Sequence, residues 1–423
     1  MKIRIDFAYD DRRISSCKIP QERLSHIYKM SEPARPAQLR DQILHAFAHP
    51  IGAPMLSELI KGKEKIAVLV DDITRPTPVD KILPFILEEL SVHGVRSEQV
   101  TLVIALGSHR PMTEGEIQQR LGRQVARDYR VLNSRFDEPD HLVHLGTSED
   151  GVPIFIEEEV AKADLKIGIG SIAPHGAVGW SGGAKIVYPG VAGRETVMRF
   201  HFAHGLTEEN MTGKDDCPVR SKMEKWVDIL GLDFVVNSVL TPDNRIYRVV
   251  AGHYQHAQRR GVVFAKEVYL TQIREKADIV LSASYAHDID FWQAAKGIYG
   301  PDALVKDGGT LLLITPCPEG TGPHPEFLPR IGRDDNRDVL QGILQGRTKL
   351  PPDPISLAPA AMLAKMRRRV RCCVVSPGLS REELAMAGYE RFDDAQSGID
   401  TLLKRYPDGK VAVVLRSDLV FEE

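Results

Sequence analysis

The side chains with the greatest chemical capacity gather in the glycine-rich run PHGAVGWSGGAK, which covers residues 174–185. The run contains His175 and ends in Lys185, and a second histidine, His201, follows sixteen residues after the lysine. Glycine has no Cβ, so it lets backbone and ligand approach closely, although it loses more conformational entropy on folding than other residues. We therefore interpret this run as a loop that lies against a bulky, rigid ligand, with Lys185 pointing toward it, and not as a fold-building segment.

Two common phosphate-binding patterns do not fit this part of the chain. Lys185 follows Ala184 and precedes Ile186, so the spacing GxxxxGK[ST] of a P-loop is absent. Gly168 and Gly170 lack the third glycine of a dinucleotide fingerprint. The sequence therefore gives no sign of a P-loop or of a standard dinucleotide site.

A second cluster, DDITRPTP, covers residues 71–78 and follows an apolar run that predicts a strand. Backbone amides at the start of a helix suit a phosphate, and Thr74 and Arg75 add a hydroxyl and a bidentate cation. A structural explanation is that Thr77 caps the next helix, with a proline as its first residue. This explanation does not account for Asp72 and Arg75. They remain candidates for function, because charged groups near buried strand ends tend to mark sites.

Two further clusters follow predicted strands. His109 lies in GSHRP, directly after the apolar run 100–107, and an imidazole titrates near neutral pH. DIDFWQAAK covers residues 288–296, where Gln293 and Lys296 share one helical face and can hold a small carboxylate or hydroxyl. The alternative for this helix is a polar side that faces solvent. Ligands of open α/β sheets bind at the carboxyl ends of strands, so all these clusters are expected near a site.

Short apolar runs typical of buried strands alternate with longer helical patterns, which predicts an α/β protein with mainly parallel sheets. These runs cover residues 65–72, 100–107, 163–172, 277–285, 308–316, 368–377 and 409–418. Residues 78–94 predict a helix, and Thr113 with Glu116 has the spacing of a capping box. A chain of 423 residues is expected to form two domains, 1–270 and 271–423, with about the last 15 residues returning to the first domain.

Composition excludes several classes of protein. Hydrophobic residues make up 43% and charged residues 27% of the chain, as in soluble globular proteins. The net charge of −3, with both signs interspersed, predicts neither a nucleic-acid nor a membrane surface. The N-terminus has no apolar signal core. Five scattered cysteines without a CxxC spacing indicate reduced thiols, so we expect a cytoplasmic protein.

Taken together and in order, the motifs DDITRPTP, GSHRPMT, PHGAVGWSGGAK, His201 and DIDFWQAAK resemble the lactate racemase family. The resemblance spans residues 65–300. It implies two α/β domains with the active site in the cleft between them. It also implies a nickel-pincer nucleotide as cofactor, that is, Ni(II) pyridinium-3,5-bisthiocarboxylic acid mononucleotide, whose donors and a protein ligand suit square-planar nickel.

The resemblance assigns roles in the cofactor site. Lys185 would be tethered covalently to the cofactor as a thioamide, and His201 would be the protein ligand of nickel. The segment that would contact the nucleotide portion consists of Asp72, Ile73, Thr74 and Arg75.

The resemblance also assigns roles in the reaction. His109 and His175 would be the two acid–base residues, and Arg75, Gln293 and Lys296 would bind the substrate. The implied reaction is racemisation or epimerisation of a 2-hydroxy acid, either lactate, a larger acid or a sugar acid. Reversible transfer of a hydride from C2 avoids a carbanion, and each orientation of the hydroxyl needs its own base. Proteins that make the cofactor are the expected partners, whereas nucleic acid and membrane are not expected.

Two alternatives remain open at this stage. The first is a metal-dependent hydrolase or lyase, with His201, His204 and the aspartates 71 and 72 around zinc or manganese. The second is a non-catalytic carrier or sensor of the cofactor, which would need Lys185 and His201 but not two bases. We also expect Trp180 and Tyr188 among the residues that could shape the pocket.

Overall fold

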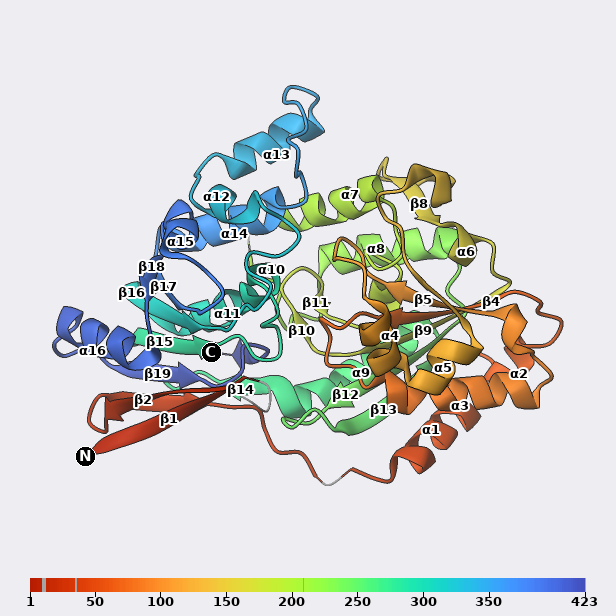
Figure 1. Cartoon of the computed structure of the whole chain (residues 1–423), viewed down its shortest axis with the longest axis horizontal. Coiled ribbons are helices and arrows are strands. Elements are labelled where there is room, and N and C mark those ends of the chain that lie inside the picture. Colours follow the sequence, from red (N-terminus) through yellow and green to blue (C-terminus); the bar gives the residue numbers. More distant parts are fainter. Residues whose placement is uncertain (10–12, 35, 208, 423) are drawn as a thin grey trace. The chain divides into compact units, whose positions relative to one another are not determined.

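The computed structural model describes residues 1–9, 13–34, 36–207 and 209–422. Helices and strands alternate along most of the chain, and the two largest sheets are mainly parallel (Figure 1), which confirms the predicted α/β class. The chain groups into two compact units. Unit 1 consists of Met1–Ser31, His201–Gly213 and Tyr269–Glu423, and unit 2 consists of Glu32–Phe200 and Lys214–Val268.

The six-stranded sheet of unit 2 is built on the predicted strands 65–72, 100–107 and 163–172. Its order is β13 (Ile246–Gly252), β12 (Phe234–Leu240), β9 (Leu165–Ser171), β4 (Ile66–Asp71), β5 (Val100–Ala105) and β6 (Arg130–Asn133). Every neighbouring pair is parallel except β12 with β13. The chain runs from β4 outward to β5 and β6 on one side and then returns to β9 on the other. β4 is therefore the point at which the winding of this sheet reverses.

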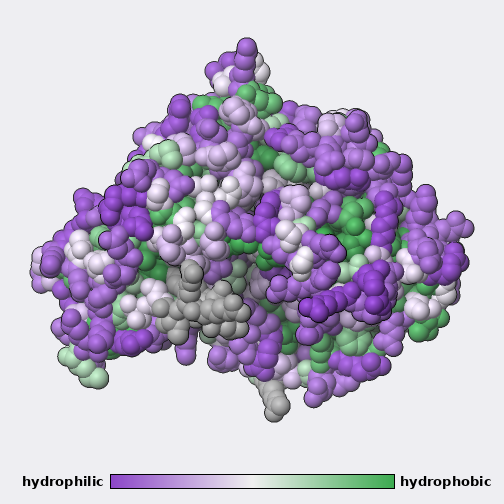
Figure 2. Space-filling model, viewed as in Figure 1, coloured by the Kyte–Doolittle hydropathy of each residue, from purple (hydrophilic) through white to green (hydrophobic). Residues whose placement is uncertain are grey.

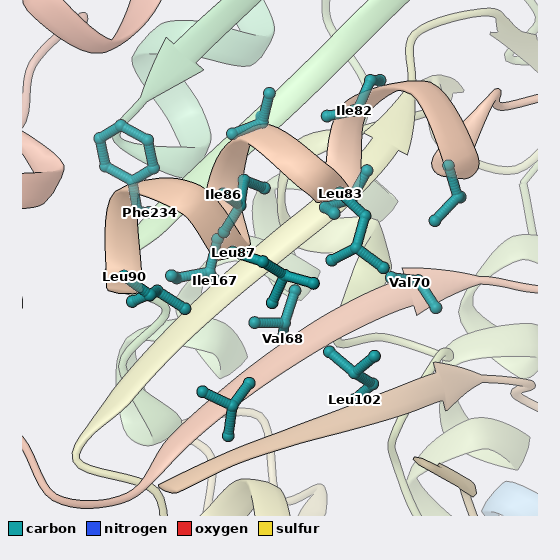
Figure 3. Packing of buried hydrophobic residues seen from close by; sticks show 14 of the residues in the cluster. Val68, Val70, Ile82, Leu83, Ile86, Leu87, Leu90, Leu102, Ile167 and Phe234 are labelled. Carbon is teal, nitrogen blue, oxygen red and sulfur yellow. The ribbon is translucent and has the colours of Figure 1, made fainter. Parts of the chain in front are cut away.

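Helix α3 (Val79–Val92) covers one face of this sheet with an apolar stripe (Figure 3). Ile82, Ile86 and Leu90 recur at helical spacing and are buried together with Val68 and Phe234 of the sheet. The predicted helix is thus confirmed, but its predicted cap is wrong. Pro78 occupies the N-cap position without a capping side chain, since the Thr77 hydroxyl donates instead to Asp71 at 2.6 Å.

The other elements of unit 2 connect and cover the sheet. The Thr113 capping box is confirmed at the start of α4 (Glu114–Leu121), where the threonine hydroxyl accepts from the amide of Glu116. Further elements of this unit are α1 (Leu39–Ala48), α2 (Leu56–Leu59), η1 (Ser97–Gln99), α5 (Arg123–Asp128), η2 (Pro139–His141), β7 (Leu142–Thr147), β8 (Pro153–Glu157), α6 (Glu158–Ala161) and α8 (Pro218–Leu230). Two helices, α7 (Arg194–Gly205) and α9 (Tyr254–Tyr269), each carry the chain from unit 2 into unit 1.

Unit 1 contains a second six-stranded sheet in which all neighbours are parallel. Its order is β18 (Glu390–Phe392), β17 (Arg371–Val375), β16 (Val305–Ile314), β15 (Ala277–Ala283), β19 (Val411–Val414) and β3 (Leu24–Tyr28). The winding reverses at β15, because β16 to β18 lie on one side of it and β19 lies on the other. The helices of this unit are α10 (Phe291–Ala294), α11 (Lys296–Tyr299), η4 (Pro301–Leu304), α12 (Phe327–Ile331), α13 (Asn336–Leu344), α14 (Leu357–Arg367), α15 (Arg381–Met386) and α16 (Ala395–Arg405).

Both ends of the chain belong to unit 1. The hairpin of β1 (Lys2–Tyr9) and β2 (Arg13–Pro20) contributes Ile5, Phe7 and Ile19 to the apolar core of this sheet. At the other end, β20 (Val420–Glu422) pairs in parallel with β14 (Leu270–Gln272). A division into domains 1–270 and 271–423 stays a prediction, because grouping by contacts describes compactness and not independent folding.

The surface and the cysteines agree with the composition. Hydrophilic side chains cover most of the face in Figure 2, with hydrophobic residues in small scattered areas. All five cysteines are buried and none forms a disulfide. Among the described helices, none has the length and apolar character that crossing a membrane requires.

The glycine-rich run forms the short pair β10 (Pro174–His175) and β11 (Gly179–Trp180), followed by the 3-10 helix η3 (Gly183–Ile186). Gly182 and Gly183 have positive φ, and a Cβ on Gly183 would lie 2.5 Å from the carbonyl oxygen of Tyr254. These two glycines are therefore required by close packing within the protein. Our interpretation that the run is not a fold-building segment is wrong at these positions.

A buried cation holds the same run in place. The guanidinium of Arg220 donates to the carbonyl oxygens of Val178 and Trp180 and pairs with Glu224. Burial lowers the pKa of Arg220 to about 10, and the Glu224 carboxylate opposes that shift. Trp180 is itself a core residue, as is Tyr188, whose hydroxyl donates to a backbone carbonyl at 3.1 Å. Both aromatic side chains therefore belong to the packed interior of unit 2.

The close packing at Gly183 predicts a large loss of stability in Gly183→Ala. A left-handed alanine costs about 1 kcal/mol, and the contact with Tyr254 raises the loss in free energy of unfolding above ~2 kcal/mol. Gly231→Ala is the matched control, because Gly231 also has positive φ but a Cβ added to it would meet no atom within 4 Å. Urea denaturation followed by the fluorescence of the two buried tryptophans of unit 2 measures both variants. Equal losses would show that backbone strain alone acts at Gly183.

Candidate active site

Three neighbouring strands of unit 2 end in the predicted site residues. His175 follows β9, Asp72 and Arg75 follow β4, and His109 follows β5. Because β9, β4 and β5 are parallel neighbours, their carboxyl ends lie along one edge of the sheet. The central one, β4, is the strand where the winding reverses, which is the usual position of ligands in open α/β sheets. Lys185 lies on η3, in the same unit.

His109 and Asp72 form a tight pair. Nδ1 of His109 lies 2.5 Å from Oδ2 of Asp72, and the side chains are 15% and 4% exposed. Burial by itself raises the pKa of the Asp72 carboxyl, but His109, Arg75 and Thr74 outweigh burial and hold this pKa well below its usual range. The carboxylate is therefore ionised and accepts a proton-bearing Nδ1. When the His109 ring is neutral, Nε2 is therefore the nitrogen with the lone pair.

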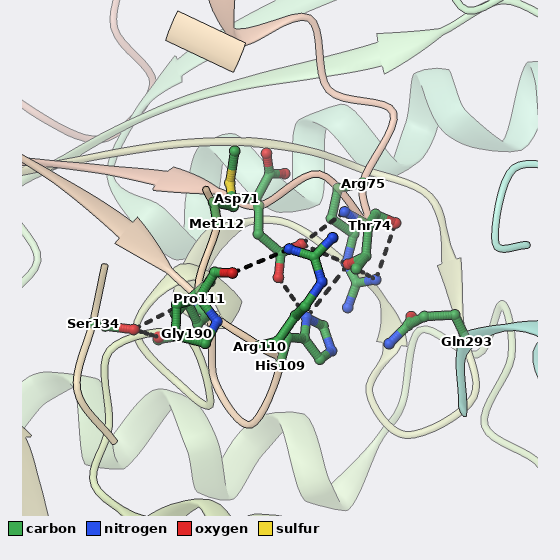
Figure 4. A network of polar contacts seen from close by, with 12 residues as sticks. Asp71, Thr74, Arg75, His109, Arg110, Pro111, Met112, Ser134, Gly190 and Gln293 are labelled. Atoms are coloured by element: carbon green, nitrogen blue, oxygen red, sulfur yellow. Dashed lines mark hydrogen bonds and ion pairs between the residues drawn. The ribbon is translucent and has the colours of Figure 1, made fainter. Parts of the chain in front are cut away.

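Thr74 and Arg75, which lie close to His109 in Figure 4, extend this pair into a hydrogen-bonded chain. The hydroxyl of Thr74 donates to Oδ1 of Asp72 at 2.6 Å, and its backbone amide donates to the same oxygen at 2.9 Å. Nη1 of Arg75 donates to the Thr74 hydroxyl at 3.0 Å. The chain of contacts thus runs from Arg75 through Thr74 to Asp72 and His109. The resemblance predicts that Asp72 contacts a nucleotide. In this structure its carboxylate positions the imidazole of His109.

The neighbouring Asp71 has a different role. Arg120 donates to its carboxylate, to its carbonyl oxygen at 3.0 Å and to the carbonyl oxygen of Arg75 at 2.9 Å. Burial raises the pKa of Asp71, and Arg120 and Thr77 oppose that rise. Asp71 and Arg120 therefore fix the loop after β4. Arg120 was missed in the sequence because it lies on α4, where it resembles an ordinary surface cation near the end of a helix.

His175 is held by the hairpin that carries it. Its Nδ1 accepts a hydrogen bond from the backbone amide of Ala177 at 3.1 Å. That amide belongs to the turn between β10 and β11, whose neighbouring carbonyls are bound by Arg220. The orientation of the His175 ring is therefore coupled to the backbone of the glycine-rich run.

Lys185 has the properties of a reactive amine. Burial, followed by the nearby charge of Arg75, lowers its pKa to about 7, although the two aspartates after β4 oppose this shift. Within the described part of the chain its half-buried ammonium group makes no hydrogen bond and no ion pair. At neutral pH a large fraction of the amine is consequently unprotonated and nucleophilic. This is the state that a lysine needs for a covalent bond to a thiocarboxyl group.

The residues of DIDFWQAAK lie in unit 1, after β15, the strand where the second sheet reverses its winding. Asp290 caps α10 by accepting from the amide of Gln293 at 2.8 Å, and burial raises its pKa to about 6. Nζ of Lys296 donates to Oε1 of Gln293 at 2.6 Å. Gln293 is only 2% exposed, so the alternative of a solvent-facing polar helix side is wrong at this residue.

The two histidines of α7 differ in environment. His204 is buried, burial lowers its pKa to about 4, and its Nδ1 has no hydrogen-bond partner among the described residues. His201 is half-buried, and its ring centroid lies 6.0 Å from that of Trp292. The sequence alone offered both histidines as possible metal ligands, but the structure places them in different environments.

Sequence reasoning missed a histidine that supports Trp292. The ring centroids of His324 and Trp292 are 4.1 Å apart, and Nδ1 of His324 lies 3.0 Å from Oδ1 of Asp353. His324 lies in a loop rich in proline and glycine after β16, and no sequence motif singles it out. Across the described residues, no group of three or more His, Cys, Asp or Glu side chains is arranged to hold a metal ion.

Comparison with known proteins agrees with these motifs. The family model described as the lactate racemase N-terminal domain matches residues 9–213. A lactate racemase of Thermoanaerobacterium thermosaccharolyticum is 28% identical over 79% of this chain and 80% of its own length. A lactate racemase of Lactiplantibacillus plantarum is 28% identical over 83% of this chain and 84% of its own length.

Solved structures extend the similarity to the whole fold. The lactate racemase apoprotein from Thermoanaerobacterium thermosaccharolyticum matches with a TM-score of 0.86 and 25% identity, over 100% of both chains. A protein from Thermotoga maritima, 18% identical, shares the fold with a TM-score of 0.67 over 88% of this chain and 100% of its own. The ordered motifs, the N-terminal match and the full-length structural agreement show that this chain is similar to lactate racemases, which are isomerases.

Proposed function

We propose that this protein racemises or epimerises a 2-hydroxy acid through hydride transfer assisted by a nickel-pincer nucleotide. The observation that carries the proposal is the buried contact of 2.5 Å between His109 and the ionised Asp72. In its neutral form, an imidazole fixed in this way carries its lone pair on Nε2, as a general base requires. The chain's relatives are named lactate racemases, so lactate is the first substrate to test, followed by larger acids and sugar acids.

The residues present fit this cofactor. The amine of Lys185, with its pKa of about 7, would form the covalent tether, and the half-buried imidazole of His201 would bind nickel. One covalent tether and one imidazole ligand need no cluster of protein ligands around the metal, since the remaining nickel donors would belong to the cofactor. When bound, the cofactor would take the hydride from C2 and return it to either face of the flat keto acid. The contribution of Ile73 stays a prediction, as do the nucleotide contacts of Asp72, Thr74 and Arg75.

The chain's own side chains would supply binding and proton transfer. Arg75 and Lys296 are cations suited to the substrate carboxylate, and Gln293 keeps Lys296 in place through their contact of 2.6 Å. His109 would take the hydroxyl proton in one orientation of the substrate, and His175 would serve the other orientation. No observation favours the alternative of a metal-dependent hydrolase or lyase. The carrier alternative differs in needing no base, so the histidine variants below distinguish it.

The direct test uses protein produced in cells that make the cofactor. Chiral chromatography of single enantiomers of 2-hydroxy acids is expected to show conversion to the other enantiomer. Washout of deuterium from C2 is a poor readout, because a hydride that returns internally leaves the label in place. If protein with a confirmed cofactor adduct converts none of the acids, including lactate, the proposed reaction is wrong.

His109→Gln is expected to lower the racemisation rate at least ~100-fold, because general acid–base catalysis contributes on that order. Asp72→Asn removes the acceptor for Nδ1 of His109 and is expected to lower kcat on the order of 100-fold or more. His175→Gln should also abolish turnover. Intact mass is the control, since each variant should still carry the Lys185 adduct. Unchanged activity in His109→Gln would leave the carrier alternative as the better explanation.

Lys185 is expected to react with acetic anhydride with a pH midpoint of about 7 in protein that lacks the cofactor. Ordinary lysine amines reach their midpoint at about 10.4. Peptide mapping by mass spectrometry measures the reaction, with the exposed Lys65 as the reference site in the same digest. Lys185→Met should remove both this labelling and the cofactor adduct. A midpoint near that of an ordinary lysine would contradict the proposed tether.

A further inference from the structure

The two histidines predicted as acid–base residues each form a hydrogen bond through Nδ1, but with opposite polarity. Nδ1 of His109 faces the carboxylate of Asp72, and an ionised carboxylate can only accept. Nδ1 of His175 faces the backbone amide of Ala177, and an amide N–H can only donate. His109 therefore carries its proton on Nδ1, whereas neutral His175 must carry it on Nε2.

The surroundings of each ring agree with these assignments. The second oxygen of Asp72 already accepts two hydrogen bonds from Thr74, one from its hydroxyl at 2.6 Å and one from its amide at 2.9 Å. Both carboxylate oxygens are thus engaged as acceptors. On the other ring, the donor at 3.1 Å belongs to the main chain and cannot reverse its polarity.

We infer that His109 and His175 are not equivalent: His109 is the proton acceptor of the resting protein, and His175 is a hydrogen-bond donor. His175 can accept a proton only after its Nδ1 separates from the amide of Ala177. Asp72 and the Ala177 amide are the positioning groups that set these states. The inference rests on the proposed function and assigns different roles to the two bases of that reaction.

The consequence concerns the hydroxyl proton of the substrate. A hydroxyl that meets Nε2 of His109 can pass its proton to the nitrogen lone pair, which gives an imidazolium paired with Asp72. A hydroxyl that meets Nε2 of His175 finds an N–H, so it accepts a hydrogen bond and keeps its proton. Loss of that N–H would require an imidazolate, which is not accessible near neutral pH. The first turnover therefore starts more readily from one of the two enantiomers than from the other.

Steady-state efficiency cannot reveal this asymmetry. Two enantiomers have equal free energy, so kcat/KM must be the same in both directions whatever the roles of the histidines. The protonation states themselves and the first turnover are the quantities to measure.

The primary test is nitrogen NMR of the imidazole rings in the full chain without cofactor, labelled with ¹⁵N-histidine, at about pH 8, above the ordinary histidine pKa. Spectra of His109→Gln and His175→Gln assign the two rings by loss of signals. We expect a protonated Nδ1 in His109 and a protonated Nε2 in His175. The same tautomer in both rings, or the reverse assignment, would overturn the inference whether or not the chain is a racemase.

Asp72→Asn provides a matched perturbation, because the amide has the shape of the carboxylate but can donate to Nδ1. The His109 signals are expected to move to the Nε2-protonated tautomer, while those of His175 stay unchanged and report that the fold is intact. An unchanged His109 tautomer would remove Asp72 as its positioning residue. If the variant does not fold, the spectra of the wild-type chain still decide the assignment.

A rapid-quench measurement on the cofactor-loaded enzyme tests the functional consequence. Keto acid should form in the first turnover roughly tenfold faster from one enantiomer, the factor that corresponds to breaking one hydrogen bond of about 1.4 kcal/mol. Equal first-turnover rates would refute the different roles but leave racemisation itself intact. Failure of the loaded enzyme to convert either enantiomer would instead refute the proposed function.

Discussion

The contact between Asp72 and His109 is the constraint on which the rest of the candidate site depends. An ionised carboxylate at the end of a buried strand is costly unless every lone pair finds a donor. Thr74 supplies two donors and His109 supplies the third, so the loop after β4 must fold back over the strand end. Arg120 holds the same loop from the other side through Asp71. The same contacts of Asp72 therefore fix both the position of the His109 imidazole and the path of the loop after β4.

Much of this arrangement could be predicted from the sequence, because it follows from short-range patterns. The apolar runs that became β4, β5, β9 and β15 are recognisable alone, and polar clusters after parallel strands must lie along one edge of a sheet. The Thr113 capping box is equally local. The different roles of Asp71 and Asp72 could not be predicted, since they depend on Arg120 and His109, which reach the loop from later segments. The packing of Gly183 against Tyr254 is likewise a contact between distant parts of the chain.

The two large sheets share one principle of construction. In each, the strand at which the winding reverses is followed by a cluster that the resemblance singled out, DDITRPTP after β4 and DIDFWQAAK after β15. Reversal leaves the two adjacent crossover connections on opposite faces of the sheet, so the strand end between them is open. Buried polar groups with shifted pKa values, such as Asp72 and Asp290, occur at these strand ends. Whether one substrate is bound by both clusters stays a prediction of the family resemblance.

The hairpin β1–β2 has a consequence for the order in which the chain acquires structure during synthesis. Its apolar residues Ile5, Phe7 and Ile19 belong to a core that also needs strands and a helix from beyond residue 276. Unit 2 ends at Val268, so all of its residues leave the ribosome before that core can close. A segment that is made before unit 2 is thus buried only after all of unit 2 has been made. In the interval its hydrophobic face remains available to chaperones or to a neighbouring nascent chain.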